Sequence, residues 1–354
     1  MTHHPRSVRF RLGLVAAAAS IVMVMTGCAA GEGSAIAPTP AVEKTKAAKV
    51  GFSTDTLNID FATYNPLSLI VKDQGYLESA LGPDVTVNWI QSAGSNKANE
   101  ALKAGAIDVG STAGAAALLA RSNGSPIRTI DIFSQPNWSA VLVGASSTIT
   151  KVADLKGKTI AATTGTDPYF FLLQSLEKAG LTTADVTIAN LQHADGKTAL
   201  ETGQVDAWAG LDPLLSTSVA TAGSRIIYDN IAFNSYGFLN ATESFVTDHP
   251  DVAQVVVNAY EKARAYAIDN PEKAVAILAE VAAIDPAIAT TTLTERTNLE
   301  VDPVPGKAQA DVLKVVGPIF VQNGDVASQA AIDDALKTLF EPTFAENADP
   351  DAIG

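Results

Sequence analysis

The chain has few residues that could carry out catalysis. Its 354 residues include a single cysteine, Cys28, and four histidines, two of which lie within the first four positions. One cysteine excludes an internal disulfide and a metal cluster held by cysteines. The Walker A, GxGxxG and HExxH motifs are also absent from the sequence. We therefore expect neither a nucleophilic triad nor a zinc site, no cofactor, and a protein that is not an enzyme.

Positive charge is scarce as well. Lysine and arginine together number 24 against 38 aspartates and glutamates, which gives a formal net charge of -14. A nucleic-acid surface needs a basic patch, so this balance argues against DNA or RNA as a partner. Hydrophobic residues reach 47% and charged residues only 18%, which is enough for a substantial core. The length allows one large domain or two moderate ones.

The N-terminus has the pattern of an export signal. Arg6, Arg9 and Arg11 precede the apolar run "LGLVAAAASIVMVM", which ends at Thr26-Gly27-Cys28. A basic start, a short apolar segment and a small-residue cleavage site are typical of a signal peptide, and the run is too short to favour a permanent membrane span. We assign residues 1–27 to this signal.

The residues around Cys28 are similar to a bacterial lipobox, in which the cysteine is lipidated and becomes the mature N-terminus. The small, polar and proline-containing residues 28–47 then form a flexible tether. The alternative is a plain signal peptide with an incidental cysteine.

Predicted strands and helices alternate along most of the remaining chain. Strands are expected at residues 49–55, 85–90, 106–112 and 127–134, separated by helices at 65–82, 95–105 and 113–124. A second alternating segment begins with a strand at residues 139–147, and helices dominate from Phe245 onward. Such alternation predicts α/β architecture with mostly parallel sheets flanked by helices.

Two lobes of this kind, joined by crossings near Ser139 and Tyr236, would enclose a cleft. We expect residues 48–138 and 237–354 to form lobe I, and residues 139–236 to form lobe II. Small-molecule sites favour domain interfaces and the carboxyl ends of parallel strands.

Helix starts are the strongest candidates for binding. Their free N–H groups and partial positive charge attract anions. An Asn-Pro or Asp-Pro pair, which is a helix-start signal, occurs seven times, so the pair alone indicates capping. The helix starts that follow a predicted strand, and so would converge on the cleft, are marked by Asn65, Ser95, Ser111-Thr112, Asp167 and Asp212. Gly94, Gly110 and Gly165 beside them allow close backbone approach.

Two tryptophans and two histidines remain to be explained. Trp138 and Trp208 lie at a predicted crossing and a strand end, where each could wall a pocket or pack in a core. His193 follows a strand, and we expect an exposed turn histidine there, with a ligand contact as the alternative. His249 precedes a proline at a helix start, so capping or exposure explains it.

Five segments of the chain resemble the periplasmic substrate-binding proteins of ABC importers, in the group for aliphatic sulfonates, taurine and nitrate. They are "NPLSLIVKDQGYLE", "SAGSNKANEALKAGAIDVGSTAGAAALLARSNG", "VADLKGKTIAATTGTDPYFFLLQSLEKAGL", "LQHADGKTALETGQVDAWAGLDP" and "AYEKARAYAIDNP". The resemblance implies the two-lobed type II periplasmic-binding-protein fold with a helical C-terminal segment. It also implies a monomer that docks to a membrane permease and its ATPase.

The resemblance also implies which residues touch the ligand. They are Thr63, Asn65, Ser95, Ser111, Thr112, Gln135, Trp138, Thr164, Gly165, Thr166, Asp167, Trp208 and Asp212. No arginine stands in these loops, so a neutral or zwitterionic ligand remains open beside an organosulfonate.

Three alternatives to a sulfonate receptor are open. The ligand could be nitrate or a pyrimidine-like heterocycle stacked on Trp138, Tyr169 or Trp208. The domain could serve a sensor protein. The fold also resembles the pyrimidine synthases of thiamine biosynthesis, but those enzymes resemble this chain least where their chemistry needs a cysteine-rich motif.

Overall fold

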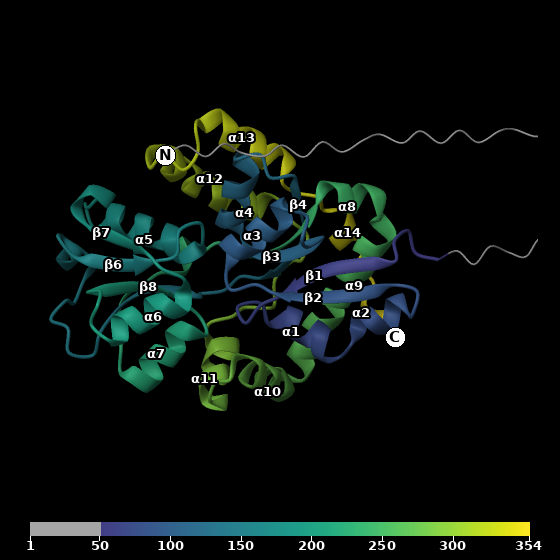
Figure 1. Cartoon of the computed structure of the whole chain (residues 1–354), viewed down its shortest axis with the longest axis horizontal. Helices are drawn as coiled ribbons and strands as arrows, with labels where there is room; N and C mark the ends of the chain where they lie inside the picture. Colours follow the sequence, from purple (N-terminus) through teal and green to yellow (C-terminus); the bar gives the residue numbers. More distant parts are fainter. Residues whose placement is uncertain (1–50) are drawn as a thin grey trace, which may run out of the picture. The chain divides into compact units, whose positions relative to one another are not determined.

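The computed structural model describes residues 51–354 (Figure 1). The predicted signal peptide, the tether with Cys28 and the first residues of the predicted strand 49–55 lie outside the described residues. No single helix within residues 51–354 is long and apolar enough to cross a membrane, although the bent pair Pro271–Ala282 and Pro286–Glu295 meets that test jointly.

The first sheet has five strands in the order β2-β1-β3-β10-β4. Its strands are β1 (Thr56–Phe61), β2 (Thr86–Gln91), β3 (Val109–Ala113), β4 (Ile127–Ser134) and β10 (Gly237–Thr242). β1 is parallel to both β2 and β3, whereas β10 is antiparallel to its neighbours β3 and β4. Its associated helices are α1 (Pro66–Asp73), α2 (Tyr76–Leu81), α3 (Ser95–Lys103) and α4 (Gly114–Ser122).

The second sheet repeats this plan with the order β7-β6-β8-β5-β9. Its strands are β5 (Ser139–Val143), β6 (Thr159–Ala162), β7 (Thr187–Asn190), β8 (Ala207–Leu211) and β9 (Arg225–Asp229). Here β5 is the strand that runs against its neighbours. Figure 1 shows α5 (Asp167–Lys178) on one face and α6 (His193–Glu201) with α7 (Leu214–Ala222) on the other. The predicted fold class, mostly parallel sheets flanked by helices, is confirmed.

The C-terminal third of the chain is helical, as predicted. Its helices are α8 (Glu243–Asp248), α9 (Pro250–Asp269), α10 (Pro271–Ala282), α11 (Pro286–Thr290), α12 (Lys307–Gln322), α13 (Gln329–Thr338) and α14 (Thr343–Glu346), with a π-helical turn at Thr291–Glu295. α12 reaches the second sheet's helices, since the rings of Phe320 and Phe170 on α5 lie 4.5 Å apart.

Three predicted elements differ from the structure. The first strand is Thr56–Phe61 rather than residues 49–55, because Leu57 and Ile59 there alternate into the core. The predicted helix 65–82 is two helices, broken at Gly75, whose φ of 63° is left-handed. The sequence pattern did not predict β9 and β10, which are short and interrupted by polar residues.

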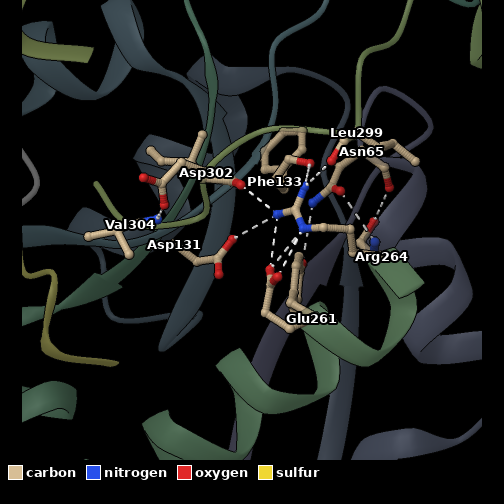
Figure 2. A network of polar contacts seen from close by, with 11 residues as sticks. Asn65, Asp131, Phe133, Glu261, Arg264, Leu299, Asp302 and Val304 are labelled. Carbon is tan, nitrogen blue, oxygen red and sulfur yellow. Dashed lines mark hydrogen bonds and ion pairs between the residues drawn. The ribbon is translucent and has the colours of Figure 1, made fainter. Parts of the chain in front are cut away.

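A buried arginine fastens the C-terminal segment to the first sheet (Figure 2). Arg264 on α9 donates to the carbonyl oxygens of Ile132 and Phe133 on β4 and of Leu299 beyond the helices, at 2.6, 3.1 and 2.7 Å. Glu261, one turn earlier on α9, accepts from the same guanidinium. Residues 296–298, which precede Leu299, lie along the first crossing between the sheets, because Asn137 N in that crossing donates to the Arg296 carbonyl oxygen at 2.8 Å.

Candidate functional site

Three segments distant in sequence meet at the carboxylate of Asp167. Trp138, in the first crossing between the sheets, donates its indole N–H to Asp167 Oδ2 at 2.7 Å. Ser235, in the second crossing, donates its backbone N–H at 2.8 Å and its hydroxyl at 2.6 Å. Asp167 begins α5, so both crossings are tied to one helix of the second sheet.

The capping role expected for Asp167 is wrong. Thr166 occupies the cap position of α5, and Asp167 is the first helical residue, with its carboxylate turned to the crossings. Burial raises the pKa of Asp167, and the hydrogen bonds from Ser235 and Trp138 oppose that shift. Within residues 51–354 no cation pairs with this carboxylate, so three hydrogen-bond donors take the place of a counter-charge.

Ser235 extends the junction to the first sheet. Its hydroxyl oxygen accepts from the backbone N–H of Ala115 at 3.0 Å. Gly114 N, the first residue of α4, donates to the carbonyl of Tyr236 at 2.8 Å. The start of α4 and the start of α5 are thus joined through the second crossing.

A second buried carboxylate holds the predicted loop at Ser111. Asp60 near the end of β1 accepts from Ser111 N at 2.9 Å and from the Ser111 hydroxyl at 3.0 Å. Tyr64 donates its hydroxyl to the Ser111 carbonyl at 2.9 Å. Burial raises the pKa of Asp60 to about 7, against the lowering effect of hydrogen bonds from Ser92 and Ser111. Asp60 is not among the predicted site residues, although an aspartate at an inward position of a buried strand was the available signal.

Thr112, Ser95 and Asn65, three further predicted residues of the first sheet's loops, also form hydrogen bonds within the protein. Thr112 Oγ1 accepts from Asn240 Nδ2 at 2.8 Å and donates to the Ala113 carbonyl. Ser95 Oγ accepts from Ala113 N at 2.9 Å. Asn65 caps α1 by accepting from Ser68 N, as expected, and donates its amide N–H to the Tyr260 hydroxyl at 3.3 Å.

The predicted loop after β6 is partly open. Thr164 is exposed and its backbone N–H donates to Asn190 Oδ1 at 3.0 Å. Thr166 is buried and donates its hydroxyl to the Thr163 carbonyl at 2.6 Å. Gly165 lines a cavity of about 240 Å³ together with Asn96 and Asn99 of α3. Thr63 and Gln135 are half-buried.

Trp208 lies apart from this junction. It is fully buried in a small apolar cluster with Leu142, Leu200 and Leu215. A Cβ placed on Gly196 of α6 would lie 2.8 Å from its indole nitrogen, which shows how closely α6 packs on the ring. Of the two uses considered for Trp208, the structure shows core packing.

Asp212 has both a local and a distant partner. Its carboxylate accepts from Ser216 N at 3.0 Å and from the Ser216 hydroxyl at 2.6 Å, and it forms an ion pair with Arg296. Pro213 occupies the cap position of α7, which begins at Leu214, so Asp212 is not the cap residue that was expected, although its carboxylate accepts from an N–H group of the first turn. Burial raises the pKa of Asp212, and Arg296 lowers it.

Arg296 was missed because the predicted loops contain no arginine. It arrives from the C-terminal segment, 84 residues from Asp212 in sequence, and also lies 3.4 Å from Asp229. A cavity of about 530 Å³ beside it is lined by Asp229 and by apolar side chains of α7, β9 and α11, and by none of the predicted ligand residues.

His193 differs most from its expectation. It is 2% exposed at the start of α6, so the expected exposed turn histidine is wrong. Burial lowers its pKa to about 4, which keeps the imidazole neutral at physiological pH. The only sequence signal at His193 was its position directly after a predicted strand, and that position does not indicate that the side chain is buried.

Within residues 51–354 no group of three His, Cys, Asp or Glu side chains lies together in a way that could hold a metal ion. The polar groups at the sheet ends are hydroxyls, amides, backbone N–H groups and buried carboxylates. Such a set recognises a ligand by hydrogen bonds rather than by coordination to a metal.

The two five-stranded sheets, each with one reversed strand and joined by two tied crossings, have the architecture of a periplasmic binding protein. The alkanesulfonate-binding protein SsuA of Xanthomonas axonopodis pv. citri, solved with MOPS, superposes with a TM-score of 0.73 and 25% identity, over 80% of this chain and 98% of that one. A protein of Escherichia coli (strain K12) named as an aliphatic sulfonates-binding protein is 27% identical over 83% of this chain and 91% of its own length. The chain belongs to the NMT1/THI5-like family, which matches residues 68–274.

More distant structures share the fold alone. The nitrate-binding protein NrtA of Synechocystis PCC 6803 is 13% identical, with a TM-score of 0.70 over 86% of this chain and 92% of that one. The desulfurization enzyme DszB is 17% identical, with a TM-score of 0.61 over 83% and 98%. The two relatives of higher identity described above are binding proteins by name.

Proposed function

We propose that this protein is the substrate-binding component of an ABC import system and captures a small organosulfonate, an aliphatic sulfonate or a taurine-like compound, between its two sheets. It then delivers the ligand to a membrane permease that works with a cytoplasmic ATPase. The similarity to two sulfonate-binding proteins over about four fifths of the chain supports this proposal.

The observation that carries the proposal is the junction at Asp167. Both crossings between the sheets end on this one carboxylate, and the starts of α4 and α5 meet beside it. Loops at the carboxyl ends of strands from both sheets are thus held together beside Asp167. Open α/β folds bind small ligands at such strand ends. Residues 48–138 with 237–354 form the first lobe in this proposal, and residues 139–236 the second.

The buried carboxylates favour a ligand that carries hydrogen-bond donors. Within the described residues 51–354, neither Asp167 nor Asp60 has a cationic partner, and Arg296 is already shared by Asp212 and Asp229. A ligand with hydrogen-bond donors as well as a sulfonate, as in a taurine-like compound, suits this setting better than a bare anion such as nitrate.

A heterocycle receptor is the second candidate. The ring of Trp138 lies 6.0 Å from that of Tyr64 and 6.3 Å from that of Phe133, in edge-to-face arrangements. An aromatic ligand could replace one of these ring contacts. Protection of tryptophan fluorescence by a pyrimidine and not by sulfonates would favour this candidate.

We further propose that the protein is exported and held at the outer face of the cell membrane by a lipid on Cys28, and that it acts as a monomer without enzymatic activity. Loss of membrane association in a Cys28→Ser variant, with the folded domain still secreted, is the expected result. A wild type that is already absent from the membrane fraction would leave only a plain export signal.

Calorimetry on the mature domain tests the ligand class. We expect saturable heats, with one ligand per chain, from short alkanesulfonates or taurine, and weaker or no binding of nitrate and pyrimidines. If no sulfonate gives a heat of binding and nitrate or a pyrimidine does, the sulfonate proposal is wrong and the compound that binds indicates the ligand class.

A further inference from the structure

The cavity of about 530 Å³ beside Arg296 lies outside the Asp167 junction, since neither Trp138, Asp167 nor Ser235 lines it. α7 and β9 of the second sheet form one wall, and α11 with the π-helical turn Thr291–Glu295 forms the other. Figure 1 shows α11 beside α7. Pockets for small molecules have volumes of about 300–1,000 Å³ and favour such places between two parts of a fold. This cavity therefore has room for a second small molecule.

Much of the cavity surface is apolar and reaches solvent. Val219 of α7 and Ile226 of β9 are 38% and 39% exposed, and both line the cavity. Apolar side chains gathered at one hollow of a surface are typical of ligand grooves. A hydrocarbon chain placed here would cover them, and each CH₂ group that it buries is worth roughly a fourfold gain in affinity. The other apolar residues of the lining are Leu215, Ala220, Ala287 and Ile288.

The polar end of the cavity carries more negative than positive charge. Asp229, Glu295 and Arg296 line it, and Asp212 forms an ion pair with Arg296 without lining the cavity itself. Three carboxylates therefore surround one guanidinium. Since Asp212 alone balances the charge of Arg296, the charges of Asp229 and Glu295 are left over.

These two carboxylates are also more accessible than the guanidinium. The side chain of Arg296 is 11% exposed, whereas that of Asp229 is 34% exposed and Glu295 is an exposed residue. Asp229 Oδ2 accepts from Asn137 Nδ2 at 3.2 Å and lies 3.4 Å from Arg296 Nη1, which leaves Oδ1 without a contact inside residues 51–354. Within the same residues Glu295 has neither a hydrogen bond nor an ion pair through its carboxylate. The cavity therefore offers acceptors and negative charge to whatever enters it.

We propose that this cavity binds a small organic cation, an alkylammonium compound, whose charge lies beside Asp229 and Glu295 and whose hydrocarbon part covers Val219 and Ile226. A primary ammonium group has three N–H donors for the free carboxylate oxygens. An anion would be repelled by the same carboxylates, so this ligand is opposite in charge to a sulfonate. The π-helical turn supports the assignment, because such turns are rare and frequent at functional sites, and its Thr291 and Glu295 both line the cavity. The inference goes beyond the proposed function and does not depend on it.

Calorimetry on the mature domain with three probes of one chain length tests the charge of the ligand: n-hexylammonium, n-hexanol and hexanoate. We expect one hexylammonium to bind per chain, roughly tenfold more tightly than hexanol, because each partly exposed carboxylate contributes a factor of up to about five. Hexanoate should not bind at this cavity. n-Butylammonium, shorter by two CH₂ groups, tests the apolar wall and should bind roughly tenfold more weakly than hexylammonium.

A matched pair of variants tests the place. Glu295→Gln removes one carboxylate from the cavity and should weaken hexylammonium binding by about three- to fivefold, with hexanol binding unchanged. Glu280→Gln, at an exposed carboxylate of α10 outside the cavity lining, is the control and should bind hexylammonium as the wild type does. Both side chains are exposed, so neither variant disturbs the core.

The possible results separate the inference from the proposed function. Failure of hexylammonium to bind, equal affinity for hexanol, or equal affinity in Glu295→Gln and the wild type refutes the cation site and leaves the sulfonate receptor intact. Displacement of hexylammonium by ethanesulfonate would place both ligands at one site and also refutes it. A domain that binds hexylammonium as expected, but neither ethanesulfonate nor taurine, supports the cation site and contradicts the proposed function.

Discussion

At the scale of single residues, the unusual groups are carboxylates buried without a cation. Asp60 and Asp167 are both within 1% of full burial and are held by serine, tryptophan and backbone donors. Charge of this kind is costly unless several donors surround it. Both carboxylates position a loop, Asp60 at Ser111 and Asp167 at the two crossings.

The titration of Asp60 gives a testable consequence. Its pKa of about 7 in the folded protein lies above the value of 3.8 in the unfolded chain, so the folded state holds an extra proton between these pH values. Asp60 therefore destabilises the fold increasingly as pH rises from 4 to 7. Asp60→Asn should gain roughly 2 kcal/mol relative to the wild type between pH 5 and pH 8.

Urea unfolding at the two pH values measures this difference. Asp73→Asn, at an exposed carboxylate of the same sheet's α1, serves as the control and should track the wild type. Parallel stability curves for the wild type and Asp60→Asn would show that Asp60 stays ionised or neutral in both states.

At the scale of elements, the sequence predicted the alternating strands and helices well and the strands between residues 225 and 242 not at all. β10 reads "GFLNAT", with an asparagine and a threonine that are nonetheless buried, because Asn240 bonds to Thr112 and Thr129 on the neighbouring strands. The side-chain partners that make such a strand possible lie more than 100 residues away, where local pattern carries no information.

The features of the candidate site that could be predicted from the sequence are also the local ones. The loops at strand ends could be predicted because a parallel sheet brings them to one edge. The burial of His193, the arrival of Arg296 from the tail and the true partners of Asp167 depend on packing between distant segments. These features appear only when the chain is folded.

The start of β10 allows a test of element packing. A Cβ on Gly237 would lie 2.3 Å from a ring carbon of Phe133 on β4, closer than any real contact. Gly237→Ala should therefore cost about 1–3 kcal/mol. Phe133→Leu should relieve part of it, so that the double variant loses less than the sum of the single variants.

Gly144→Ala is the matched control, since its nearest atom, the Leu200 carbonyl oxygen, is 4.0 Å away. Its stability in urea should stay close to that of the wild type. Additive losses in the Gly237 and Phe133 variants would mean that the cost of Gly237→Ala does not come from the Phe133 ring.

At the scale of the whole molecule, the two sheets are tied at Asp167. Asp167→Ala leaves the Trp138 indole and two Ser235 donors without their acceptor, and a buried donor without a partner costs about 1–3 kcal/mol. We expect a loss of about 3 kcal/mol in unfolding free energy and a shift in tryptophan emission. Thr166→Ala removes one hydroxyl donor next to it and should cost about 1 kcal/mol.

Equal losses in the two variants would show that Asp167 contributes no more than its neighbour. Small-angle scattering of Asp167→Ala adds a readout that stability cannot give. A scattering curve that changes only for Asp167→Ala, and not for Thr166→Ala, is the result expected if this carboxylate sets how the sheets are joined.

The place of β10 between β3 and β4 has a consequence for the order of folding. β3 and β4 do not pair directly, and the strand that separates them is synthesised only after the whole second sheet. The first sheet therefore cannot be completed until the chain has emerged beyond Thr242, however early its first strands appear. Pairings this distant in sequence raise the contact order and slow folding.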